Sequence, residues 1–241
     1  MMKMRILAAL GAVAMLSLSA CSGENAVDKT PAAGSPDLEA VETILADLPL
    51  GSTPLQPFNA DATVQLRQQM DLMGSEVRNT ANLNHIEIQP ASRGCKAMLS
   101  ESFALENLHW PSIAAMSKDE KAAVQVFLAP EAAAVAKTMN QMRNLASQCP
   151  EATVSSSTGK VRVVTTVNAP DSAVCPWGYR QSVTRDGVSQ TLDVCQMGYR
   201  NTLLSVAIAD SSDSSVATDR VMDNFAQSFF ARLKPLYDNQ S

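Results

Sequence analysis

The chain has 241 residues, of which 46% are hydrophobic and 18% are charged. This balance is typical of a globular protein and excludes an intrinsically disordered chain. The formal net charge is −5 at pH 7. An acidic chain without a cluster of basic residues repels phosphate backbones, so we expect no binding to nucleic acid.

The first twenty residues have the layout of a secretory signal peptide. Lys3 and Arg5 precede an apolar run from Ile6 to Leu18, and small residues follow up to Cys21. That run is shorter than the ~20 residues that a membrane-spanning helix needs, so we expect the signal to be cleaved. Leu18-Ser-Ala-Cys21 resembles the lipobox of bacterial lipoproteins. The resemblance implies acylation of Cys21 with palmitate-type chains and anchoring at the extracytoplasmic face of the cell membrane. Ordinary secretion with a chance cysteine is the alternative.

Residues 21 to 36 are predicted to form the lipidated N-terminus and a flexible tether. They are mostly small and polar, and proline and glycine recur among them. As a flexible chain, this tether would hold the domain on the order of 20 Å from the membrane. Residues 37 to 241 are long enough for one large domain, which is the organisation that we expect.

The other four cysteines are Cys95, Cys149, Cys175 and Cys195. An even number in an exported protein predicts two disulfides, for which three connectivities are possible. We expect Cys95–Cys149 and Cys175–Cys195, because Asp186-Gly187 predicts a two-residue hairpin turn that brings the last two cysteines close together. No cysteine pair has C-x-x-C spacing and there are two histidines, so we expect no metal and no cofactor.

Four helices are predicted from apolar spacing, at residues 37–48, 61–76, 130–148 and 213–234, with a further short one around Cys95. Pro130 can open the third. Its apolar stripe is better explained as core than as a binding surface. The stripe consists of Val135, Met139, Met142 and Ala146. The last helix should face inward with Met222, Phe225, Phe229 and Leu233, and end at Pro235.

Strands are predicted over residues 84–88, 112–115, 122–128, 161–167, 179–185, 188–195 and 203–209. Ser117 to Glu120 fits a capping box, so a helix is the alternative between the second and third of these strands. Consecutive strands joined by short turns favour an α+β fold, with a twisted antiparallel sheet flanked by helices.

One short pattern, C-x-x-G-Y-R, occurs twice, at residues 175–180 and 195–200. A functional interpretation makes its tyrosines and arginines a recognition surface beside a disulfide. The structural interpretation, which we favour, is that each glycine relieves the backbone beside the cross-link while each tyrosine packs over it.

Catalytic motifs are absent from the sequence, which contains no G-x-S-x-G, H-E-x-x-H, Walker or G-x-G-x-x-G pattern. A hydrolase would have to use His85 or His109, and we predict a protein that is not an enzyme. The aspartates of residues 210–213 lack an EF-hand pattern and are better explained as a cap for the last helix.

The predicted framework resembles the extracytoplasmic sensor domain of PknH-type mycobacterial kinases and related lipoproteins. The resemblance rests on the lipobox, the four cysteines, the strand-to-helix segment 124–136, and the cysteine-bearing hairpin before a long C-terminal helix. It spans residues 37–237 and implies a single α+β domain with two disulfides and a ligand-binding cleft. This chain has no kinase domain, so any signalling would need a partner.

The sequence therefore predicts a lipid-anchored envelope protein that binds a small ligand or another envelope protein. Large aromatic side chains are the candidates for lining a binding pocket, although core packing is the plainer explanation for them. These candidates are Trp110, Trp177, Tyr179 and Tyr199. A purely structural docking lipoprotein is the remaining alternative.

Overall fold

The computed structural model describes residues 31–57, 87–90, 92, 95, 110–119, 121–156, 159–168, 175–185, 187–209 and 215–239. Cys21, the predicted helix over 61–76, both histidines and residues 210–213 lie outside this part. Among the described helices, none is long and apolar enough to cross a membrane.

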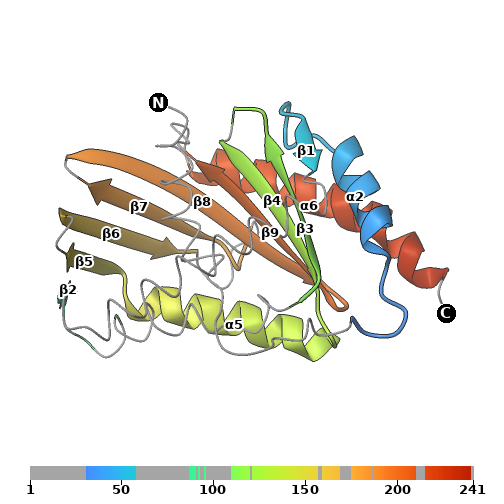
Figure 1. Cartoon of the computed structure of the whole chain (residues 1–241), viewed down its shortest axis with the longest axis horizontal. Helices are drawn as coiled ribbons and strands as arrows, with labels where there is room; N and C mark the ends of the chain where they lie inside the picture. Colours follow the sequence, from blue (N-terminus) through green and yellow to red (C-terminus); the bar gives the residue numbers. More distant parts are fainter. Residues whose placement is uncertain are drawn as a thin grey trace.

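The described strands form one antiparallel sheet in the order β1-β3-β4-β9-β8-β7-β6-β5-β2 (Figure 1). Both edge strands are short, and the long strands occupy the middle. The strands are β1 (Leu55–Pro57), β2 (Glu87–Gln89), β3 (Ser112–Ser117), β4 (Ala122–Leu128), β5 (Glu151–Ser156), β6 (Gly159–Val167), β7 (Tyr179–Arg185), β8 (Val188–Tyr199) and β9 (Thr202–Ala209).

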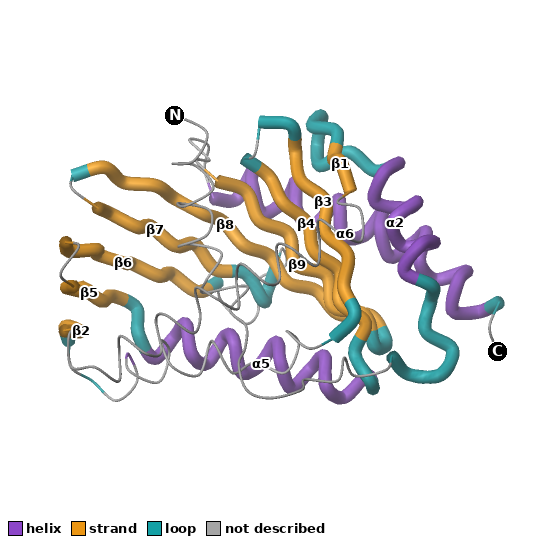
Figure 2. The backbone as a smooth tube through the Cα atoms, in the orientation of Figure 1, coloured by secondary structure: helices purple, strands orange, loops and turns teal. Residues whose placement is uncertain are grey.

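Three described helices cover the sheet, with α2 and α6 on one face and α5 on the other (Figure 2). Their bounds are α2 (Leu38–Asp47), α5 (Ala132–Gln148) and α6 (Ser215–Asp238). We call the two sides of the sheet the α6 face and the α5 face. The α+β fold predicted from the sequence is confirmed.

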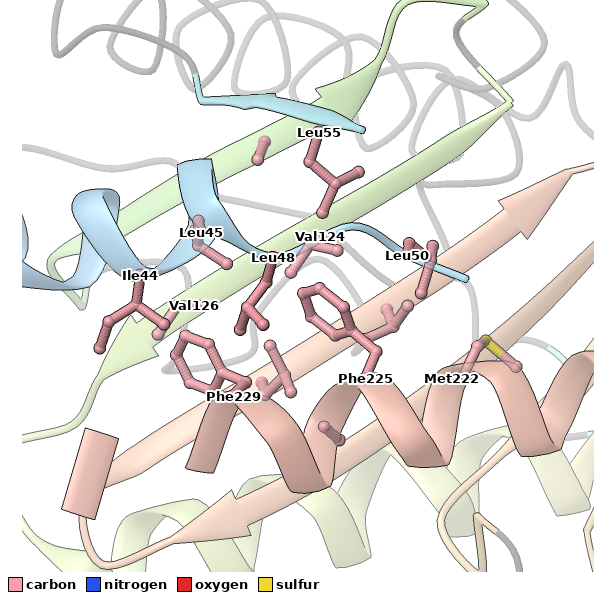
Figure 3. Packing of buried hydrophobic residues seen from close by; sticks show 14 of the residues in the cluster. Ile44, Leu45, Leu48, Leu50, Leu55, Val124, Val126, Met222, Phe225 and Phe229 are labelled. Atoms are coloured by element: carbon pink, nitrogen blue, oxygen red, sulfur yellow. The ribbon is translucent and has the colours of Figure 1, made fainter. Parts of the chain in front are cut away.

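The main core lies on the α6 face, where the apolar stripes of α2 and α6 meet β4 and β9 (Figure 3). The inward-facing side chains predicted for the last helix are all buried. Asp37 caps α2 by accepting a hydrogen bond from the Glu39 amide at 3.1 Å. The apolar periodicity read from the sequence therefore identifies the buried stripes of these two helices.

Both predicted disulfides, Cys95–Cys149 and Cys175–Cys195, are present. The β7–β8 hairpin has the expected register, since Arg185 pairs with Val188 and Tyr179 pairs with Val194. Gly187 has a φ of 79°, which favours glycine in the turn.

Two local sequence signals have a different outcome. The capping-box pattern, which offered a helix as the alternative, instead serves the connection between β3 and β4: Ser117 Oγ accepts a hydrogen bond from the Ala122 amide at 2.9 Å and donates to Asp119 at 2.6 Å. The prediction that Pro235 ends the last helix is wrong, because α6 runs on to Asp238. The Tyr237 hydroxyl lies 2.6 Å from Thr202 Oγ1, so a buried contact holds the turn that follows the proline.

Candidate functional site

The two tryptophans among the candidate binding residues meet on the α5 face. Trp110 is fully buried just before β3, and Trp177, in the loop before β7, is half-buried against the same cluster. Val135 and Met139 of α5 and Leu203 of β9 complete this contact. The structure therefore gives Trp110 a core position and leaves part of Trp177 accessible.

Arg143 of α5 fixes the loop that carries Trp177. Its guanidinium donates to the Pro176 carbonyl at 2.6 Å and to the Asn168 carbonyl at 2.7 Å. The same group lies over the Trp177 ring, 5.5 Å from the ring centroid. This loop is therefore tied to α5 at three points beside the sheet.

The two tyrosines lie on opposite faces of the sheet. Tyr179 is buried on the α5 face with Leu192 and Val194. Tyr199 packs on the α6 face, with ring centroids 5.9 Å from Phe230 and 5.8 Å from Tyr237. Three of the four candidate residues thus share the α5 face, and Tyr199 lies apart from them.

Of the two glycines in the repeated C-x-x-G-Y-R pattern, only Gly178 has the expected role beside the cross-link. A Cβ at Gly178 would lie 2.6 Å from Asn168 Nδ2 and 3.0 Å from the Cys175 carbonyl oxygen. A Cβ at Gly198 would lie 2.7 Å from Val135 Cγ1. Each glycine thus permits a close approach, one beside the disulfide and the other against α5.

The arginines of the two copies have different surroundings. Arg180 makes two hydrogen bonds of 2.7 Å to the carboxylate of Asp193, which is 2% exposed. Arg200 lies over the Tyr237 ring at 5.0 Å and pairs with Asp238 at 3.3 Å. The two copies therefore do not form one symmetrical recognition surface.

A buried polar side chain, Gln181, lies among the apolar residues of the α5 face. It is 1% exposed, and its Nε2 donates to Thr165 Oγ1 on β6 at 3.1 Å. Across the part of the chain that the structure describes, no donor reaches its Oε1. An unmet buried acceptor costs about 1–3 kcal/mol, so this oxygen calls for a hydrogen-bonding partner.

Sequence reasoning did not single out Gln181. The segment Tyr179–Arg185 carries polar residues on both faces of its strand, so alternation alone does not tell which face is buried. The observable signal is a glutamine in phase with Tyr179 and Val183.

A second polar cluster lies near the start of α6, on the opposite side. Asn168 Nδ2 donates to Asp219 Oδ2 at 3.1 Å and to the Cys175 carbonyl at 2.9 Å. Burial raises the pKa of Asp219 above its ordinary value, and the neighbouring carboxylate of Asp193 adds to this effect. The hydrogen bond from Asn168 and the charge of Arg180 oppose it.

Replacing Asp219 with asparagine is expected to stabilise the domain at pH 7. A raised pKa means that the folded state binds the proton more tightly, so wild-type stability falls as the pH rises from 3.8 through the folded pKa. Asp219→Asn removes that slope and keeps an acceptor for Asn168. Urea unfolding between pH 3.5 and 7 measures the free energy of unfolding of both proteins. Asp223→Asn, on the same helix, is the control for the change in charge. A variant less stable than wild type at pH 7 would contradict this prediction.

Within the described residues, no group of three histidine, cysteine or acidic side chains is placed to hold a metal ion. The site consists instead of apolar and aromatic side chains around one buried amide. Such a surface can bind a molecule by burial and hydrogen bonding.

No family model and no curated protein matches this sequence. Among solved structures, the chain is similar to the extracellular domain of PknH from Mycobacterium tuberculosis, with 10% sequence identity and a TM-score of 0.43. The alignment covers 86% of this chain and 99% of that domain. The kinase family of this structural neighbour is the one that the sequence pattern resembles.

Proposed function

We propose that this chain is an exported, lipid-anchored protein of the cell envelope whose domain binds a small ligand without catalysing a reaction. The ligand is an apolar molecule that carries a hydrogen-bond donor, and it binds on the α5 face of β6, β7 and β8. The buried Oε1 of Gln181 is the observation that supports this ligand class most directly.

The disulfides support export. All four of their cysteines are at most 1% exposed. Disulfides persist in oxidising compartments and are rare in the cytosol, where thiols are kept reduced. Together with the lipobox pattern that ends at Cys21, they favour a mature protein outside the cytoplasm.

The surroundings of Gln181 support ligand binding. Its strand neighbours on this face are apolar or aromatic: Tyr179, Val183 and, across the β7–β8 pair, Leu192 and Val194. Thr165 holds the amide by its nitrogen, so the oxygen remains available as an acceptor. A ligand N–H or O–H would satisfy this acceptor while its apolar part packed against these side chains.

Replacing Cys21 with serine is expected to release the protein from the membrane. Serine cannot form the thioether that carries the diacylglycerol, so the variant should lose incorporation of labelled palmitate and move from the membrane to the soluble exported fraction. Fractionation of cells producing either form, followed by immunoblotting, measures this. A Ser22→Ala variant is the matched control. Equal membrane recovery of the Cys21→Ser form would contradict the lipid anchor.

Replacing Gln181 with methionine is expected to lower ligand retention about tenfold, because one hydrogen bond to the ligand is lost while side-chain size is kept. Native mass spectrometry of protein purified from its own envelope measures the fraction that retains added mass. The apo form should be about as stable as wild type, since removal of the unmet acceptor offsets the lost hydrogen bond to Thr165 Oγ1.

Gln227→Met makes the same chemical change at an exposed position of α6 and should leave retention unchanged. Equal retention by the Gln181→Met and wild-type proteins would contradict the proposed site. A wild-type protein that carries no added mass would contradict ligand binding. An internal water would then be the hydrogen-bonding partner of Gln181 Oε1.

A further inference from the structure

We propose that the domain stands end-on at the membrane, with the β8–β9 turn toward the lipid surface and the β7–β8 turn away from it. The partner of the near end is the lipid bilayer itself. This inference rests on the proposed lipid anchor at Cys21.

The first evidence is the place where the N-terminal segment joins the domain. The Ala32 amide donates to the Ala129 carbonyl at 3.3 Å, and Asn201 Nδ2 donates to Ser35 Oγ at 2.7 Å. Pro36, the residue before the cap of α2, is buried. The segment predicted to be tether is therefore held on the domain from Ala32 onward.

Asn201, in the β8–β9 turn, connects this attachment to two further parts of the fold. Its Nδ2 also donates to the Ala129 carbonyl at 2.7 Å, and the Ala129 amide donates back to the Asn201 carbonyl at 2.7 Å. The Tyr237 hydroxyl donates to Asn201 Oδ1 at 2.6 Å. The β8–β9 turn, the β4–α5 connection, the end of α6 and the tether thus meet at one site.

That site lies at one end of the elongated sheet. In Figure 1, the β8–β9 turn, the start of α2 and the C-terminus lie at the right, whereas the ends of β5, β6, β7 and β8 that meet in the hairpin turns lie at the left. Gly187 and Val188 mark the left end, and Val188 is 66% exposed. The tether therefore leaves the domain at the end opposite the β7–β8 turn.

Chain length decides which end faces the lipid. The eleven steps from Cys21 to Ala32 span about 18 Å as a flexible chain and at most about 38 Å when fully extended. Strand β8 contains 12 residues and spans about 40 Å from one turn to the other. A tether fixed at the Asn201 end would therefore reach a membrane at the β7–β8 turn only when fully extended, at a large cost in chain entropy, so the Asn201 end is the one that faces the membrane.

Paramagnetic NMR on the lipidated mature chain in nanodiscs tests the orientation. A trace of gadolinium-chelate lipid broadens amide signals steeply with proximity to the bilayer. We expect the signals of Tyr199 and Asn201 to be broadened several-fold more than those of Gly187 and Val188. A Gly-Ser insertion after Gly23 that doubles the tether should reduce this difference.

The outcomes separate the two proposals. A chain recovered free of the discs, with no broadening anywhere, means that the lipid anchor is absent. Equal broadening at both ends, or stronger broadening at Gly187 and Val188, overturns the end-on orientation while the anchor stands. A pattern that the longer tether leaves unchanged also overturns the inference, because tether length would then not set the orientation.

Discussion

Replacing Cys95 and Cys149 with alanine is expected to lower the free energy of unfolding by about 4 kcal/mol. This bridge joins residues that are 54 positions apart, and its loss frees a long loop in the unfolded chain. The Cys175–Cys195 bridge spans 20 positions, for which the same chain-entropy reasoning gives about 3 kcal/mol. The longer loop should therefore contribute more.

Urea unfolding of the mature chain, carrying Cys21→Ser so that it is soluble, measures both values. The pair variants serve as controls for each other, because each removes two buried sulfur atoms and opens one disulfide loop while the other bridge stays intact. A larger loss for Cys175→Ala/Cys195→Ala would contradict the loop-length argument. It would show instead that packing of Cys175 and Cys195 in the core of the α6 face dominates.

Local sequence signals predicted the elements that carry a clear apolar periodicity or a tight-turn signal. Strand β4 has the predicted bounds, and α2 and α5 begin and end within two residues of their predicted limits. The Cys175–Cys195 pairing followed from the turn at Gly187, because a two-residue loop fixes the register of every pair behind it.

The missed elements depend on contacts that are distant in sequence. β1 is three residues long and ends at Pro57, and it forms because β3 offers a free edge for pairing. β5 pairs with β6, although its sequence, Glu151 to Ser156, is largely polar. The intrinsic strand propensities of these residues do not predict such pairings, which depend on the neighbouring strand.

The candidate site could be predicted only in part. Aromatic residues near the cysteines suggested a binding surface, and the sheet brings Trp110, Trp177 and Tyr179 to one face of the structure. Tyr199 falls on the other face because strand β8 alternates its side chains, and Met197 and Tyr199 both contact the main core. Gln181 is identified as a candidate only by its burial in the folded sheet, because the order of residues along the strand does not show which face is buried.

Truncating Phe229 to alanine is expected to lower the free energy of unfolding by about 3–5 kcal/mol. Phe229 is 0% exposed at the centre of the contact between α6, α2 and the sheet. Its ring lies 6.5 Å from that of Phe225 and 5.5 Å from that of Phe230, measured between centroids. Removing it leaves a cavity that three packed elements can fill only by moving together.

Phe230 supplies the matched control, because it is the next residue of the same helix and is only half-buried. Phe230→Ala makes the same chemical change and has the same effect on helix propensity, so the difference between the two variants isolates burial. We expect Phe230→Ala to lower the free energy of unfolding by about half as much or less, since side-chain area that is already exposed to water does not contribute to burial. Equal losses in urea unfolding would mean that α6 does not dock through its Phe229 stripe, and the two-faced packing of the sheet would have to be revised.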